Sequence, residues 1–212
     1  MTCHWLHFEQ GTPEWKQARC GLLTASHSTD MSSILKSGAE SAKRKNLKKQ
    51  LVAERFTGIP THVKVNYDMQ WGTDNEPLAR GTYSEFTGNR VEIVGLAISK
   101  EIELLGASPD GMIGDEGVLE IKCPTSQTFV DWVVEGVVPD QHKPQMLIQL
   151  AVTGRKWCDF VAFDPRFPAE QDLFIRRFTP HAREIEAMKK AAREFLAEVA
   201  AMERAFLKAR MV

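Results

Sequence analysis

The stretch SPDGMIGDEGVLEIKCP, residues 108–124, combines a Pro-Asp-Gly turn with an apolar strand that carries two charges of opposite sign. Proline fixes φ and glycine tolerates a positive φ, so we expect Asp110 at a tight turn where one strand ends. Glu120 and Lys122 follow in the next strand, after a glycine-containing hairpin. When that hairpin folds back, Asp110 and Glu120 come to lie side by side.

The two charged residues of the second strand are expected on a single face, because strand side chains alternate faces with a period of two. Leu119, Ile121 and Cys123 share the opposite face, which we expect to pack on the core. The face with Glu120 and Lys122 is then predicted to line a cleft. An exposed hairpin with a solvated Glu–Lys pair has the same spacing, so the motif alone leaves both interpretations open.

A divalent cation would stabilise the carboxylate pair, since neighbouring carboxylates repel one another and lose hydration when they are buried. Oxygen ligands of this kind suit Mg²⁺, for which Mn²⁺ can substitute. A water bound to such a metal is acidified and can attack a phosphodiester, with Lys122 directed at the water or at the scissile phosphate. One or two metal ions are compatible with the pair.

The composition is that of an ordinary soluble protein, with 43% hydrophobic and 26% charged residues in 212. A net charge of −1 gives no overall basic field, so a nucleic-acid partner would have to be bound by a local patch. Four scattered cysteines without a CxxC pair favour a reducing cytoplasm. No apolar run approaches the roughly 18 residues of a membrane span, and no signal-peptide pattern is present. We therefore expect a cytoplasmic protein without membrane contact.

The predicted elements are helices first, then a group of strands, then alternating helices and strands, which indicates one α/β or α+β domain over residues 1–212. We expect Thr73 or Asp74 to cap the fourth helix, with Pro77 in its first turn and Gly88 after its end. Helices are predicted over residues 14–20, within 23–38, and over 40–56, 73–87, 128–135, 141–154 and 180–210. Strands are predicted over residues 90–99, 101–106, 118–123, 156–165 and 172–178.

The last predicted helix carries apolar residues at alternating spacings of three and four, a heptad-like seam. We expect this seam to pack on the sheet of the same domain, and a subunit contact is the alternative. Its members are Ile185, Met188, Ala192, Phe195, Val199, Met202 and Phe206.

Further stretches resemble, in the same order, the signatures of one family. WKQARCGLLTAS resembles an R-x-G-x-x-T-A-S element, WGTDNEPLAR resembles a W-G-x-x-x-E-P-x-A helix, and KPQMLIQLAVTG and FVAFDPRF match the segments that come after the catalytic lysine. Together with SPDG and LEIKCP, they resemble the phage λ exonuclease and YqaJ-type viral recombinase branch of the PD-(D/E)xK nucleases. The resemblance spans about residues 15–167 and implies a restriction-endonuclease-like α/β (α+β) core, a central mixed β-sheet flanked by helices.

The resemblance implies roles for individual residues. Asp110 and Glu120 would bind the catalytic metal together with the backbone carbonyl of Ile121, and Lys122 would activate or orient the attacking water. Glu76 falls at the additional active-site acid of the family. Without the resemblance, its position favours an ordinary acid near a helix start, stabilised by the helix dipole.

The same resemblance implies two further groups. Arg19 and Ser26 fall in the element that receives the 5′ phosphate of DNA, with Lys36 as a third candidate, and a guanidinium beside a hydroxyl near a helix N-terminus suits a phosphate on physical grounds as well. Gln145 matches the first glutamine of a Q-x-Q motif, whereas a leucine occupies the second position and Gln149 lies two residues further on. Which glutamine faces the site is left open.

A basic run over residues 36–55 holds seven cations and only two acids. Such a run is either a solvated helix face or, beside a nuclease site, a contact for the DNA backbone.

The resemblance implies a Mg²⁺-dependent exonuclease that degrades double-stranded DNA ends in the 5′→3′ direction, releases mononucleotides and leaves 3′ single-stranded tails for recombination. It also implies a ring-shaped homotrimer, a single-strand annealing recombinase as partner, and action in the cytoplasm of a bacterial host. The alternatives are a restriction-type endonuclease or RecB-like nuclease, which share the Asp/Glu/Lys core, and a non-catalytic DNA-end-binding module.

Overall fold

The structure, a computed structural model, describes residues 2–62 and 64–210. Its helices are α1 (Pro13–Ala18), α2 (Ser28–Met31), α3 (Ala42–Thr57), α4 (Tyr67–Thr87), α5 (Ser126–Glu135), α6 (Lys143–Thr153) and α7 (Ala182–Ala209), with short 3₁₀ turns at Ala25–His27 and Asp140–His142. Its strands are β1 (Cys3–Leu6), β2 (Leu23–Thr24), β3 (Val91–Glu92), β4 (Leu96–Ser99), β5 (Leu105–Ala107), β6 (Gly111–Ile113), β7 (Gly117–Lys122), β8 (Trp157–Phe163) and β9 (Leu173–Phe178).

Two mixed sheets flanked by helices form the fold, which confirms the predicted α/β class. The first sheet has the strand order β1-β4-β5-β2, and the second has the order β3-β6-β7-β8-β9. In the second sheet, β7 pairs antiparallel with β6 and parallel with β8, so it is the middle strand. Residues 108–110 connect β5 of the first sheet to β6 of the second. The single central sheet expected from the sequence is therefore divided in two, and the turn that carries Asp110 joins the parts.

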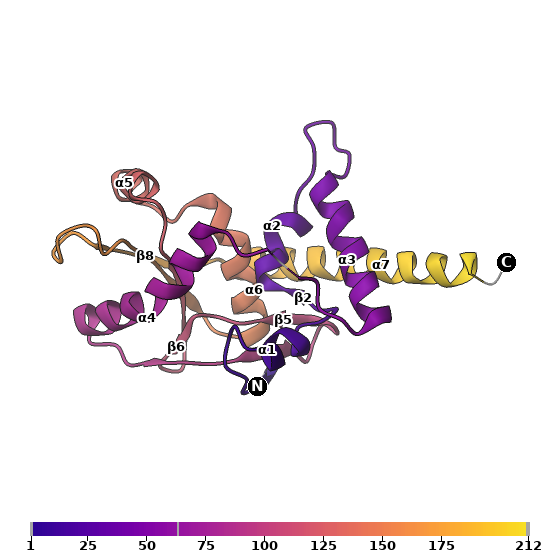
Figure 1. Cartoon of the computed structure of the whole chain (residues 1–212), viewed down its shortest axis with the longest axis horizontal. Coiled ribbons are helices and arrows are strands. Elements are labelled where there is room, and N and C mark those ends of the chain that lie inside the picture. Colours follow the sequence, from indigo (N-terminus) through magenta and orange to yellow (C-terminus); the bar gives the residue numbers. More distant parts are fainter. Residues whose placement is uncertain (1, 63, 211–212) are drawn as a thin grey trace.

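The helices are distributed around both sheets (Figure 1). α4 and α5 lie toward one end of the molecule with β6 and β8, whereas α2 and α3 lie toward the other end with β2 and β5. α6 contacts strands of both sheets and also packs against α7. The loop between α2 and α3 and the C-terminal end of α7 project from the body. Among the residues described, no helix is long and apolar enough to cross a membrane.

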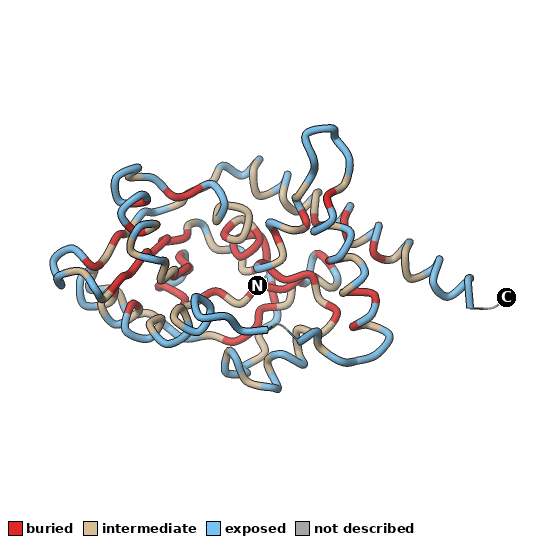
Figure 2. Tube along the Cα trace, turned by 45° about the horizontal axis from the view of Figure 1, so that its top comes forward, coloured by how far each residue is buried: buried red, intermediate tan, exposed pale blue. Residues whose placement is uncertain are grey.

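Both faces of β7 pack in hydrophobic clusters. Leu119 and Ile121 pack on one face with Tyr83 of α4, while Val118 packs on the other with Phe129 of α5. The buried segments accordingly gather in the interior of the body (Figure 2). The expectation that only the Leu119 face packs on the core was wrong, because α5 and α6 cover the opposite face as well.

Several element boundaries differ from those predicted. The helix expected to end near Gly38 stops at Met31, and the following loop is closed by a bridge between Ile34 and Glu40. The serines after Met31 favour a break, because serine side chains compete for backbone hydrogen bonds within helices. In addition, the strand expected over 101–106 is confined to β5, because Ser99 Oγ accepts hydrogen bonds from the following N–H groups and turns the chain there.

α4 begins earlier than predicted. Asn66 is its N-cap, and the Asn66 side chain accepts a hydrogen bond from the Met69 N–H at 2.9 Å. Thr73 therefore lies inside the helix, and Pro77 lies in the helix interior instead of its first turn. The predicted end is confirmed, since Gly88 takes a left-handed conformation with φ 71° that ends the helix without steric cost.

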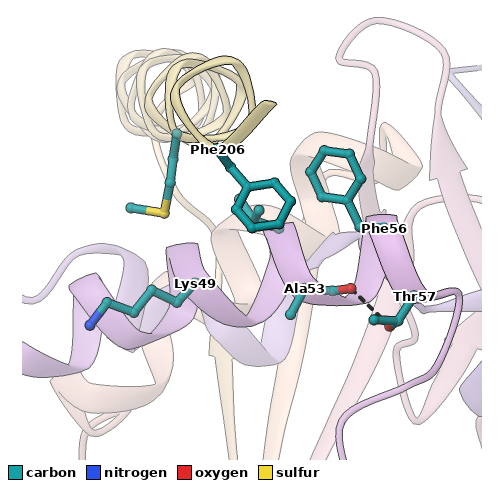
Figure 3. Close-up of a pocket in the computed structure, with 7 residues that line it drawn as sticks. Lys49, Ala53, Phe56, Thr57 and Phe206 are labelled. Carbon is teal, nitrogen blue, oxygen red and sulfur yellow. Dashed lines mark hydrogen bonds between the residues drawn. The ribbon is translucent and has the colours of Figure 1, made fainter. Parts of the chain in front are cut away.

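The apolar seam of α7 packs mainly on helices α3 and α6 of the same chain, and joins the cluster that also contains residues of β4 and β5. Ala192, Phe195 and Val199 are fully buried there. Packing within the chain was predicted correctly, but the helices, not the sheet alone, provide the surface. At the far end of the seam, Phe206 is 42% exposed and packs against Phe56 of α3, with the two rings tilted and their centroids 5.1 Å apart. These two rings border an apolar cavity of about 340 Å³ between α3 and α7 (Figure 3).

Candidate active site

Asp110, directly before β6, and Glu120 on β7 lie next to one another. The register pairs Gly111 with Leu119, and the Asp110 N–H donates to the Leu119 carbonyl at 3.0 Å. Asp110 therefore sits opposite Glu120, where the hairpin pattern predicted it. Its carboxylate Oδ2 accepts a hydrogen bond from the Ile121 N–H at 2.6 Å, which fixes the side chain against β7.

Lys122 lies on the same face of β7 as Glu120 and donates a hydrogen bond to Oε1 of that carboxylate. The Glu120 side chain is completely buried, whereas 29% of the Lys122 side chain is exposed. Part of the Lys122 side chain, unlike that of Glu120, is therefore open to solvent.

Negative charge is concentrated around these groups. Burial and the charges of Glu120 and Glu76 raise the pKa of Asp110 well above its ordinary value. Burial also raises the pKa of Glu76, with Arg80 opposing the shift and Glu120 adding to it. Burial alone would lower the pKa of Lys122, but the charges of Glu120 and Asp110 outweigh it and raise that pKa. Carboxylates held this close favour the binding of a cation.

Glu76 reaches this cluster from α4 through Arg80, a residue that the sequence did not lead us to expect in the site. Arg80 donates to a carboxylate oxygen of Glu76 one turn earlier on the helix, and its Nε donates to the backbone carbonyl of Asp110 at 3.0 Å. A guanidinium holds both groups because it offers several donors in a fixed plane. The four-residue spacing from Glu76 was the signal that could have identified Arg80.

Gln149 on α6 is the glutamine that contacts the carboxylates. Its Nε2 donates to Glu120 Oε2 at 2.5 Å, and its side chain is fully buried. Gln145 lies one turn earlier on the same helix face and is half-buried, and among the described residues its side chain forms no hydrogen bond. The structure thus brings Gln149, and not Gln145, into contact with Glu120.

The donor set fits a divalent cation of the Mg²⁺ type. Asp110, Glu120 and the carbonyl of Ile121 supply hard oxygen atoms, and the buried Oε1 of Gln149 has no hydrogen-bond partner among the described residues. No three His, Cys, Asp or Glu side chains within the described ranges converge into a closed metal cage. An open site with few protein ligands is the kind that Mg²⁺ uses, because it retains several waters.

The structure also brings Arg19 and Ser26 together. The Arg19 guanidinium donates to Ser26 Oγ at 2.8 Å and to Thr24 Oγ1 at 3.0 Å. It stacks on the ring of Trp15, with Cζ 4.0 Å from the ring centroid. Burial lowers the pKa of Arg19 to about 10, an effect that the charge of Glu54 partly opposes. A half-buried guanidinium beside two hydroxyls is a suitable receptor for an anion.

The third phosphate candidate is not part of this cluster. Lys36 is exposed on the projecting loop between α2 and α3, and among the described residues it makes no hydrogen bond to Ser26 or Thr24, the two partners of Arg19. Several cations of the basic run are also occupied within the fold, because acids of α7 and Glu40 pair with them. These ion pairs join Arg44 and Lys48 to Glu198 and Glu40, and Arg55 to Glu203.

An acid at a strand-joining turn, a Glu-x-Lys on the middle strand of a mixed sheet and a further acid on a flanking helix together define a nuclease of the PD-(D/E)xK class. Within that class, the chain belongs to the YqaJ-like viral recombinase family, whose model matches residues 14–156. No curated protein matches the chain.

Solved structures agree with this assignment. The chain is similar to an alkaline exonuclease, LHK-Exo, from Laribacter hongkongensis, with 36% sequence identity and a TM-score of 0.86 over 95% of this chain and 100% of that one. LHK-Exo in complex with dAMP gives 37% identity and the same TM-score and coverage. A phage-related exonuclease from Haemophilus somnus 129PT shares the fold, with a TM-score of 0.61 and 14% identity over 85% of this chain and 96% of that one.

Proposed function

We propose that this chain is a Mg²⁺-dependent exonuclease that degrades double-stranded DNA from its ends in the 5′→3′ direction, releases mononucleotides and leaves 3′ single-stranded tails. Its similarity to an alkaline exonuclease over nearly the whole chain supports exonucleolytic cleavage of DNA. That relative was also solved in complex with dAMP, a mononucleotide, which is consistent with release of single nucleotides. The polarity and the tails rest on the sequence resemblance.

The observation that carries the proposal is the grouping of Asp110, directly before β6, with Glu120 and Lys122 on the adjacent strand β7. A bound Mg²⁺ would acidify a water and polarise the scissile phosphate. Asp110 and Glu120 would hold that ion, and the Ile121 N–H keeps Asp110 in place for it. Lys122 carries its proton, so it would orient the water or bind a phosphate oxygen as a hydrogen-bond donor.

The remaining groups would position the DNA and the carboxylates. Gln149 fixes Glu120, and Arg80 fixes both Glu76 and the backbone of Asp110. Arg19 and Ser26 would receive the terminal 5′ phosphate. Recognition of that phosphate explains how an enzyme with a restriction-type catalytic core could act at ends instead of at internal sites.

The assembly and setting also belong to the proposal. We expect a ring-shaped homotrimer around DNA, a single-strand annealing recombinase as partner, and action in the cytoplasm of a bacterial host. The resemblance to phage-type recombination nucleases supports all three. A mass measurement in solution tests the trimer directly.

Linear and covalently closed circular duplexes of one sequence test the activity. Incubation with Mg²⁺ is expected to release nucleotides from the linear form alone, and chelation of the metal is expected to stop the release. Cutting of the closed circle would instead indicate a restriction-type endonuclease. Binding of ends without release of nucleotides in any metal would indicate a non-catalytic end-binding module.

A further inference from the structure

The candidate phosphate group and the candidate metal group lie on different sheets. Arg19 and Ser26 flank β2 at the edge of the first sheet, whereas Glu120 lies on β7 in the middle of the second. Residues 108–110, here called the connector, lead from β5 next to β2 into β6 next to β7. Asp110 is the last residue of the connector, so any constraint on the connector acts on Asp110.

Trp15 contacts both the candidate phosphate group and the connector. Its ring lies under the Arg19 guanidinium, with Cζ 4.0 Å from the ring centroid, and its indole N–H donates to Ser108 Oγ at 3.1 Å. Trp15 and Arg19 are four residues apart at the end of α1, a spacing that places them on one face of the helix. Ser108 begins the connector. One side chain therefore spans the distance between the guanidinium and the turn that positions Asp110.

Two other side chains in the described part of the chain donate hydrogen bonds to the connector, and their contacts differ from those of Trp15. Gln10 Nε2 donates to the carbonyl of Pro109 at 2.9 Å, and Arg80 Nε donates to the carbonyl of Asp110 at 3.0 Å. Gln10 also binds the carbonyl of Val94 on the preceding chain segment. Of the three side-chain donors to the connector within residues 2–62 and 64–210, Trp15 is the one that also stacks on Arg19.

We propose that Trp15 is a positioning residue that couples occupancy of the Arg19–Ser26 phosphate site to the placement of Asp110. A terminal phosphate bound by Arg19 fixes the guanidinium, the stacked indole is fixed with it, and the indole N–H then holds Ser108 and the connector in one position. Ends with a 5′ phosphate are cleaved faster, not merely bound more tightly, because the bound phosphate further restrains the connector and so holds Asp110 more firmly in its position opposite Glu120. This inference rests on the proposed function and names how its phosphate preference arises.

The test is the rate of the first cleavage at 5′-phosphate and 5′-hydroxyl ends of one duplex, measured under single-turnover conditions with a 3′-labelled strand. The first cleavage is required because every later end carries the phosphate left by the previous cut. Ser108→Ala removes the acceptor of the indole N–H and perturbs the fold least. Trp15→Phe keeps a ring under Arg19 but removes the N–H. We expect both variants to reduce the phosphate-to-hydroxyl rate ratio about threefold to tenfold, the size that a single hydrogen bond can transmit, with end affinity unchanged.

Gln10→Leu is the matched control, because it removes another donor to the connector without touching Arg19. We expect it to slow cleavage of both ends by the same factor and to leave the ratio at the wild-type value. The double variant that combines Ser108→Ala with Arg19→Ala should have the same phosphate-to-hydroxyl rate ratio as Arg19→Ala alone.

Two results would overturn the coupling in distinguishable ways. If Arg19→Ala removes the preference while Ser108→Ala leaves it intact, the phosphate site stands and Trp15 is only a structural residue. If the wild type cleaves both ends at the same rate, the assignment of Arg19 and Ser26 to the phosphate fails, and the coupling fails with it.

Discussion

The Glu120 carboxylate and the Gln149 amide form a buried hydrogen bond of 2.5 Å between the middle strand of the second sheet and helix α6. This bond leaves Lys122 to occupy the other oxygen of Glu120. Each oxygen of the Glu120 carboxylate is therefore oriented by one side chain, Gln149 of α6 or Lys122 of β7. A ligand to a metal usually depends on such outer contacts for its orientation.

Gln149→Leu keeps the volume but removes the donor to Glu120. We expect kcat to fall about 10-fold to 100-fold and the Mg²⁺ concentration for half-maximal activity to rise, as is typical when a residue that orients a metal ligand is removed. Mg²⁺ titrations of the initial rate on a linear duplex measure both effects. Gln145→Leu, one turn earlier on the same face, is the comparison, and we expect a smaller loss. A larger loss for Gln145→Leu would mean that Gln145, and not Gln149, is the glutamine that faces the substrate site, a choice that the sequence motif left open.

Lys122→Ala removes the donor that we assign to the attacking water or the scissile phosphate. We expect hydrolysis to fall about 100-fold to 1,000-fold, the usual cost of one preorganised donor in a transition state. Binding of duplex ends should survive, because Arg19 and Ser26 are unaltered. Rates and end affinities measured on the same DNA separate the two effects. Unchanged turnover in this variant would exclude Lys122 from the chemistry.

Arg80→Lys retains a positive charge but cannot bridge Glu76 and the Asp110 carbonyl with one planar group. We expect roughly a 10-fold loss of kcat with little change in KM, because the variant misplaces Asp110 without altering DNA contacts. Steady-state kinetics on a linear duplex measure the split. A change confined to KM would show that Arg80 binds DNA and does not position the carboxylate.

The sequence predicted the parts of the site that local rules determine. The position of Asp110 opposite Glu120 follows from a proline–glycine turn and strand alternation, both of which act over a few residues. The choice between Gln145 and Gln149 could not be predicted, because it depends on how α6 is rotated against β7 by its tertiary packing. The contact of Trp15 with Ser108 was equally inaccessible, since its partners are 93 residues apart.

The first residues of helices were also difficult to predict, because they too depend on tertiary packing. Thr73 and Asp74 are good caps by type, yet Asn66 caps α4, because several candidates satisfied the local rule and packing selected among them. Helix ends were predicted more successfully, since Gly88, Gly136 and Gly154 adopt the left-handed conformation that glycine permits without a steric penalty.

Glu54→Gln tests the hydrogen bonds by which Glu54 of α3 holds the loop that follows Arg19. The buried Glu54 carboxylate accepts hydrogen bonds from Gly21 N–H at 2.7 Å, Thr61 N–H at 3.1 Å and Gln50 Nε2 at 2.9 Å. Burial alone would raise the pKa of Glu54, but these hydrogen bonds outweigh burial and bring it below the ordinary 4.5. We expect the variant to lose about 1.5–3 kcal/mol of unfolding free energy at pH 7, the range for hydrogen bonds to a charged group.

The lowered pKa of Glu54 determines how the stability lost in Glu54→Gln varies with pH. A carboxylate with a depressed pKa in the folded state stabilises the fold fully above the unfolded pKa and loses that effect as the pH falls through the folded pKa. The stability difference between wild type and Glu54→Gln should therefore shrink below about pH 4.5. Urea unfolding at several pH values measures it, with the exposed Glu194→Gln as a control expected to change little. A difference that stays constant with pH would contradict the assigned role of the charge.

The most direct test of the proposed function uses two preparations of one linear duplex, one with a 5′-terminal label and the other with a 3′-terminal label. The measurement is the order in which the two labels are released. With Mg²⁺ present, we predict immediate release of the 5′ label as a mononucleotide and retention of the 3′ label in long single strands. Asp110→Asn should release neither. Early release of the 3′ label, or appearance of both labels in internal fragments, would contradict a 5′→3′ exonuclease.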